Sequence, residues 1–148
     1  MLKLGEYYFI DITRILFENG LELSKEIDSI SISLFNNANN YYKNKQFKNA
    51  KNLLSKILDI APDFLDAYFL LADISLMNKD YDEAISFYQQ ASIFTTEDKR
   101  LFYGLGKSYE GKRDYKIAKE FYQKYLTMDS ISEKAFEIKI KLLKKEFN

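Results

Sequence analysis

Phe102–Tyr122 reads FYGLGKSYEGKRDYKIAKEFY, and its arrangement of small and large apolar residues occurs twice more in the chain. Small residues recur at intervals of 34 positions in two sets, Ala38, Ala72 and Gly106, then Ala50, Ala84 and Ala118. Between them, apolar residues recur every three or four positions, which is the spacing of amphipathic helices. Because small residues allow two helices to cross closely, the pattern predicts a repeated pair of antiparallel helices.

The stretch from Phe102 to Tyr122 resembles the tetratricopeptide repeat (TPR) family, with Phe102 in place of the family's tryptophan. The resemblance covers three units, 31–64, 65–98 and 99–132, followed by a capping helix at 133–148. It implies an all-α fold, a TPR-like right-handed superhelical solenoid of antiparallel helix pairs. We expect helices at 31–44, 47–61, 64–78, 81–94, 98–111, 115–128 and 132–146. The last helix is expected to turn an apolar side to the third unit and a charged side to water.

Residues 1–30 follow the repeat less closely. Leu4-Gly5-x-x-Tyr8 keeps the register, yet Phe17 stands where the repeat has a small residue. Three arrangements of this helical segment remain open: a degenerate leading repeat, a cap over the open end of the array, or a segment folded back into the groove. The chain begins without a signal-peptide pattern and has no run long enough to cross a membrane, so we expect it in the cytoplasm.

The composition excludes several kinds of chemistry. The 148 residues include no Cys and no His, and 22 basic side chains balance 22 acidic ones. Thiolate and imidazole catalysis are therefore excluded, and the commonest metal ligand is missing. The acidic groups gather near predicted helix starts, where negative charge stabilises the helix dipole: Asp80, Asp82, Glu83, Glu97 and Asp98. We predict no catalytic residue, no cofactor and no metal site, and thus no enzyme.

Basic residues of the third unit raise nucleic-acid binding as an alternative. They are Lys107, Lys112, Arg113, Lys116, Lys119 and Lys124. Tyrosines stand among them, and lysines beside stacked rings can hold single strands. These tyrosines occupy packing positions of the repeat, however, and the acidic second unit interrupts any basic stripe. Nucleic-acid binding is therefore disfavoured.

The inner wall of the predicted superhelix is the candidate binding site. The resemblance places these residues on it: Ile32, Phe35, Asn39, Tyr42, Phe69, Leu70, Asp73, Met77, Arg100, Tyr103 and Lys107. They form an apolar surface with a few charges, which packing between the repeats is not expected to require. Such a groove suits a helix or extended peptide with apolar anchors, so we expect a non-catalytic scaffold or adaptor. The alternative is a structural or self-associating module, whose groove is filled by its own N-terminus or by another copy in a homo-oligomer.

The sequence shows whether the chain has the residues for one known function of the family, the docking of chaperone tails. Chaperone-docking members hold the C-terminal carboxylate of a heat-shock protein with Lys, Asn, Asn, Lys and Arg. The matching positions here are Phe35, Asn39, Leu70, Arg100 and Tyr103. Only Asn39 and Arg100 are compatible, so most of the charge-assisted hydrogen bonds that capture a carboxylate are missing. We therefore predict no specific binding of heat-shock protein tails.

Overall fold

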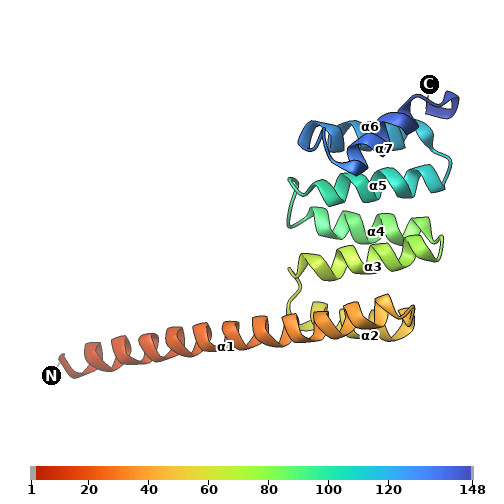
Figure 1. Cartoon of the computed structure of the whole chain (residues 1–148). Helices are drawn as coiled ribbons and strands as arrows, with labels where there is room; N and C mark the ends of the chain where they lie inside the picture. The colour runs from red at the N-terminus through yellow and green to blue at the C-terminus, as the bar shows by residue number, and fades with distance from the viewer. Residues whose placement is uncertain (1–2, 148) are drawn as a thin grey trace.

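The computed structural model describes the backbone of residues 3–147 and the side chains of residues 17–147. The helices are α1 (Lys3–Lys43), α2 (Phe47–Ile60), α3 (Leu65–Met77), α4 (Tyr81–Ser92), α5 (Lys99–Gly111), α6 (Tyr115–Met128) and α7 (Glu133–Leu142), followed by the 3-10 turn η1 (Lys145–Phe147). Within this described range no strand occurs. The helices lie one above another, with α1 and α2 at one end of the stack and α6 and α7 at the other (Figure 1). The all-α array of helix pairs predicted from the repeat is confirmed.

Each unit turns between its two helices on one residue in the left-handed backbone region. These residues are Lys45, Lys79 and Arg113, with φ of 58°, 61° and 64°. The acidic residue that follows Lys79 or Arg113 caps the next helix. Asp80 accepts a hydrogen bond from the backbone N–H of Glu83, and Asp114 accepts one in the same way at α6. The 34-residue period therefore repeats the turn as well as the helices.

The small residues of the repeat lie at the helix crossings, as predicted. Ala38, Ala50, Ala72, Ala84 and Ala118 are all 0% exposed. A Cβ atom placed on Gly106 would lie 2.5 Å from the ring of Tyr122 on α6. The tyrosine ring occupies the space that the glycine leaves, which allows α5 and α6 to pack closely.

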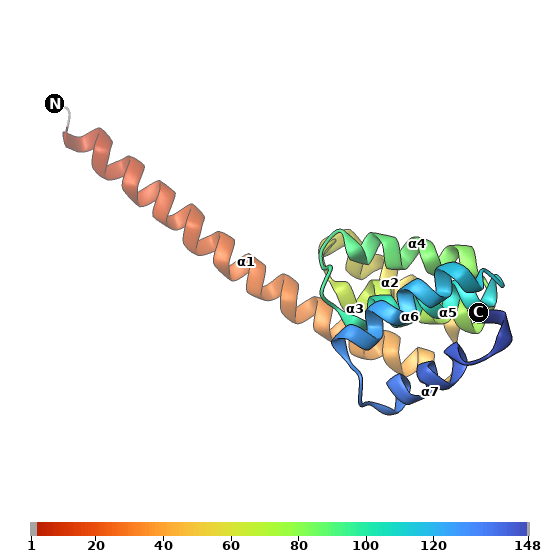
Figure 2. The same cartoon turned by 90° about the horizontal axis from the view of Figure 1, so that it is seen from above.

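The N-terminal segment is helical and continues directly into the first unit. α1 is one continuous helix from Lys3 to Lys43, so no turn divides residues 3–30 from the first unit. Both views show its N-terminal part extending out of the stack of helices (Figures 1 and 2). The turn that a leading repeat requires is absent, because the first left-handed residue of the described chain is Lys45. Residues 1 and 2 lie outside the described residues.

The length of α1 raises the question of a membrane span. Among the residues that the structure describes, no helix combines the length and the apolar character needed to cross a bilayer. Charged side chains such as Glu18, Glu22 and Lys25 interrupt the apolar positions of α1.

The C-terminal helix is shorter than predicted and differs in its outer face. α7 ends at Leu142, and Phe147 in η1 is buried. Lys139, Lys144 and Lys145 are exposed as expected, but three residues expected on the buried apolar side are exposed too: Phe136, Ile140 and Leu143. Lysines and apolar residues alternate along α7, so each type falls on both sides of the helix. Lys141 thus turns inward and forms an ion pair with Glu110 of α5 at 2.8 Å.

Candidate functional site

A cavity of about 480 Å³ opens along the first helices of the units, between α1, α3, α5 and the start of α7. It is lined by Phe35, Asp66, Phe69, Leu70, Asp73, Tyr88, Lys99, Arg100, Tyr103, Tyr125, Asp129, Ser132, Glu133 and Lys134. Rings and aliphatic groups alternate with charges of both signs. A cavity of this size can take a few side chains of a bound chain rather than a whole folded domain.

Six of the eleven predicted site residues line this cavity. They are Phe35, Phe69, Leu70, Asp73, Arg100 and Tyr103. The other five lie outside its lining: Ile32, Asn39, Tyr42, Met77 and Lys107. Ile32 and Met77 are exposed, and the ring of Tyr42 packs against Phe47 with 5.8 Å between centroids. The role of all eleven as ligand contacts stays a prediction.

Phe69 and Leu70 serve the core as well as the cavity. Their exposed fractions are 6% and 7%, and each belongs to a cluster of buried apolar side chains. The expectation that packing does not require them is therefore wrong. α3 is the middle first helix of the array, and the neighbouring units cover it on both sides, so even its cavity-facing side chains are mostly enclosed.

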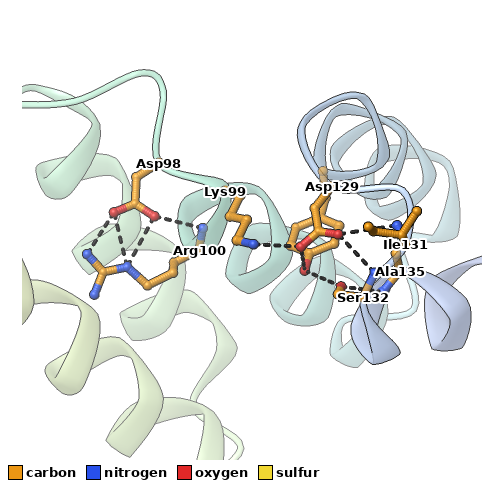
Figure 3. Close-up of polar contacts among 8 residues, drawn as sticks. Asp98, Lys99, Arg100, Asp129, Ile131, Ser132 and Ala135 are labelled. Atoms are coloured by element: carbon orange, nitrogen blue, oxygen red, sulfur yellow. Dashed lines mark hydrogen bonds and ion pairs between the residues drawn. The ribbon is translucent and has the colours of Figure 1, made fainter.

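Arg100 is held in place by two carboxylates. Its guanidinium donates to Asp66 and to Asp98 at 2.7 Å each, and its Cζ atom lies 4.3 Å from the centroid of the Phe69 ring. Figure 3 shows the pair with Asp98. Since a guanidinium has a fixed fork of donors, these two acids occupy much of the capacity that Arg100 could offer to a ligand.

Asp129 lines the C-terminal side of the cavity, and Figure 3 shows its polar contacts. Its carboxylate accepts a hydrogen bond from Lys99 at 2.6 Å and from the backbone N–H groups of Ile131 and Ser132. The bond from Lys99, followed by the backbone bond from Ser132, holds the pKa of Asp129 well below its usual range. Ser132 in turn caps α7 by accepting from Ala135 N–H at 3.2 Å. This network connects α5 to the start of α7.

Tyr103 stands between two lysines at the edge of the cavity. The Nζ atoms of Lys134 and Lys107 lie 4.7 Å and 5.6 Å from the centroid of its ring, within cation–π range. Burial and the nearby Glu137 raise the pKa of the Tyr103 hydroxyl to about 12. The phenol therefore stays protonated at neutral pH and can donate a hydrogen bond to a ligand.

Asp73 is the carboxylate in the middle of the cavity. It accepts a hydrogen bond from Tyr88 Oη at 3.2 Å. The side chain keeps contact with solvent, but the walls of the cavity crowd it, and this burial raises its pKa above the ordinary value of 3.8. The bond from Tyr88 and the charges of Lys134 and Lys107 oppose the rise. Asp73 is thus a solvent-accessible acceptor whose charged form is disfavoured by the crowded walls around it.

The raised pKa of Asp73 predicts a pH-dependent effect on stability. A carboxyl whose pKa is higher in the folded state costs stability as pH rises above its unfolded value. Asp73→Asn should therefore raise the free energy of unfolding at neutral pH, by less than about 1 kcal/mol because solvent screens the group. Below the ordinary pKa the gain should vanish. Thermal unfolding at both pH values measures it, with Asp66→Asn, which loses an ion pair, as the control. An equal gain at both pH values would contradict the prediction.

The sequence prediction missed the contribution of the C-terminal wall and of α4. Lys134 lies 34 residues after Arg100, which lies 34 residues after Asp66, so extending the register by one unit would have found it. Tyr88 belongs to the second helix of its unit and reaches the cavity beside Gly104, where a Cβ atom would collide with the tyrosine ring. No pattern on α4 itself indicates that the hydroxyl emerges there.

The described residues offer no evident metal site. Within residues covered by the search, no group of three or more acidic side chains is placed to hold a metal ion. The ion pairs of the cavity instead join acids to Lys99 and Arg100.

The sequence was compared with models of known protein families and with curated proteins. Two models of the tetratricopeptide repeat match the chain, one over residues 41–107 and one over residues 99–131. A comparison of the sequence with curated proteins found no match.

Several solved structures that share this arrangement of helices are TPR domains. The Arabidopsis OM64 TPR domain has 19% sequence identity and a TM-score of 0.72, over 79% of this chain and 97% of that one. The first TPR of Spaghetti (RPAP3), bound to the HSP90 peptide SRMEEVD, has 18% identity and a TM-score of 0.70, over 78% and 95%. The second TPR domain of human RPAP3, in complex with the HSP70 peptide SGPTIEEVD, has 18% identity and a TM-score of 0.72, over 80% and 99%. These structures share the fold, and the two family models, which together span residues 41–131, show that the chain belongs to the tetratricopeptide repeat family.

Proposed function

We propose that the chain is a non-catalytic interaction module that binds a helix or extended peptide in the cavity between α3, α5 and α7. The observation that supports this most directly is the lining itself. Apolar side chains, Phe35, Leu70 and the ring of Tyr103, lie beside charges of both signs. A peptide with apolar anchors and a few polar groups matches that chemistry.

The proposed ligand differs from the chaperone tails held by two of the similar structures. Those complexes contain HSP90 and HSP70 peptides that end in EEVD. Here Phe35, Leu70 and Tyr103 replace polar clamp residues, and Arg100 is already paired with Asp66 and Asp98. The lining holds four carboxylates (Asp66, Asp73, Asp129 and Glu133) and three cations (Lys99, Arg100 and Lys134), so capture of an acidic tail is disfavoured.

The alternative of a structural module whose groove is filled by its own N-terminus is not favoured. The described part of α1 leaves the stack, and among residues 17–147 the cavity lining begins at Phe35. The cavity is therefore available to a separate chain.

A displayed library of random peptides tests the proposal directly. Peptides selected on the wild-type protein should bind at least about tenfold more weakly to Asp73→Lys and Lys134→Glu, which reverse charges inside the cavity. Both side chains are exposed, so the fold should survive. Lys56→Glu, an exposed charge reversal on α2, is the matched control and should leave binding unchanged. The proposal fails if no peptide is enriched, or if the cavity variants bind as tightly as the control.

The prediction that heat-shock protein tails are not bound is tested by a separate measurement. The peptide SRMEEVD and its C-terminally amidated form should both show no saturable binding in a calorimetric titration. Micromolar binding of the free acid, lost on amidation, would show that the carboxylate is captured despite the missing clamp residues.

A further inference from the structure

α7 exposes a helix-packing face. Phe136, Ile140 and Leu143, spaced one and two turns apart, are 67%, 49% and 82% exposed. Ile140 lies 34 residues after Gly106, the position that packs against the second helix of the third unit. In α7 this register position faces no second helix within the described chain, so a position that is buried in each earlier unit stays open.

α1 exposes a second face of the same kind. Within its first unit α1 packs through Leu34 and the buried Ala38. The same row continues towards the N-terminus through Ile30, Ile27 and Leu23, at helical spacing. Figure 1 shows the N-terminal part of α1 extending past the end of α2. Ile30 and Leu23 are exposed.

A glycine on α1 leaves an unfilled notch beside this row. Three helical glycines of the stack each have a tyrosine ring where a Cβ atom would stand: Gly104 has Tyr88, Gly106 has Tyr122 and Gly111 has Tyr81. Gly20 has no heavy atom of the described side chains within 4 Å of that position. Glycine inside a helix costs stability relative to alanine, so a close approach by another side chain is a physical reason for it. An exposed ring, Phe136 of α7, is the matching shape.

Charge favours contact between the two faces over contact of either face with itself. Residues 17–30 carry four carboxylates and one lysine, whereas residues 133–147 carry five lysines and three glutamates. Pairing α1 with α1, or α7 with α7, brings like charges together, while pairing α1 with α7 brings opposite charges together.

We infer that α1 of one copy packs on α7 of a second copy, with Phe136 seated at Gly20. Every copy carries both faces, and the contact joins two different surfaces. Association is therefore head to tail, and an array that does not close on itself can go on growing. This interface is separate from the peptide cavity.

Two variants that each remove one face test the inference. Gly20→Lys fills the notch and adds a positive charge to the acidic α1 face. Phe136→Glu removes the ring and adds a negative charge to the basic α7 face. Light scattering after gel filtration should give a mass that rises with concentration for the wild type and a monomer mass for each variant alone. An equal mixture should give a dimer that grows no further, because one intact α1 face and one intact α7 face remain.

The controls carry the same chemical changes at other exposed positions. Ser29→Lys lies on the polar side of α1, and Ile131→Glu lies in the loop before α7. Both should associate like the wild type, and circular dichroism should show unchanged helix content in all four variants. A wild type that stays monomeric up to about 1 mM would overturn the inference. So would self-association of Phe136→Glu alone, of Gly20→Lys alone, or a mixture that remains monomeric.

Discussion

Phe69→Ala should lower the free energy of unfolding by about 3–5 kcal/mol, the cost of removing a buried phenylalanine ring. The ring is 6% exposed and lies in the cluster that joins α3, α4 and α5. It also packs against Tyr88, with 6.1 Å between ring centroids, and beneath the guanidinium of Arg100. Because several neighbours hold its place, the cavity left by alanine cannot close easily. Equilibrium unfolding in denaturant measures the loss.

Met77→Ala on the same helix is the matched control. Met77 was predicted as a site residue together with Phe69, but its side chain is exposed. Its removal should change stability by no more than about 0.5 kcal/mol. If the two variants lose the same stability, the ring of Phe69 is not part of the core. Loss of peptide binding in a Phe69 variant therefore cannot be assigned to a direct contact, whereas the charges of Asp73 and Lys134 can be tested without this complication.

Gly106→Leu should destabilise the chain by about 3 kcal/mol, at the upper end of the cost of overpacking a core. A Cβ atom alone would lie 2.5 Å from the Tyr122 ring, and leucine adds three further carbons. Tyr122 is fully buried and its hydroxyl donates a hydrogen bond to Glu110, so the ring has little freedom to move aside. The loss should appear as a lower midpoint in thermal unfolding.

Lys107→Leu supplies the control for this substitution. It introduces the same side chain at the next position of α5, where the native side chain is exposed. The backbone is already helical there, so the midpoint should hardly change. Equal losses from the two variants would mean that leucine disturbs α5 in some way other than by contact with Tyr122.

The helices and their crossings followed from the sequence because they depend on neighbours close along the chain. A 34-residue period places Ala38, Ala72 and Gly106 in equivalent surroundings, and each unit packs on the next through the same positions. Turns and caps recur with that period, as Lys79 with Asp80 and the matching pair in the third unit show. Six predicted residues consequently line the cavity, since the first helix of each unit faces it.

The ends of the array and the depth of burial required the tertiary structure. Whether a side chain is buried depends on whether a neighbouring helix covers it, and local periodicity is the same with or without that neighbour. Phe69 lies between two units and is enclosed, while Ile140, in the register of Gly106, lies on the last helix of the described stack and faces solvent. The same reason applies at the two ends of the array. Among the described helices, α1 continues past Leu23 without a packed partner helix, whereas Lys134 of α7 lies in the wall of the cavity because α7 packs beside α5 and α6.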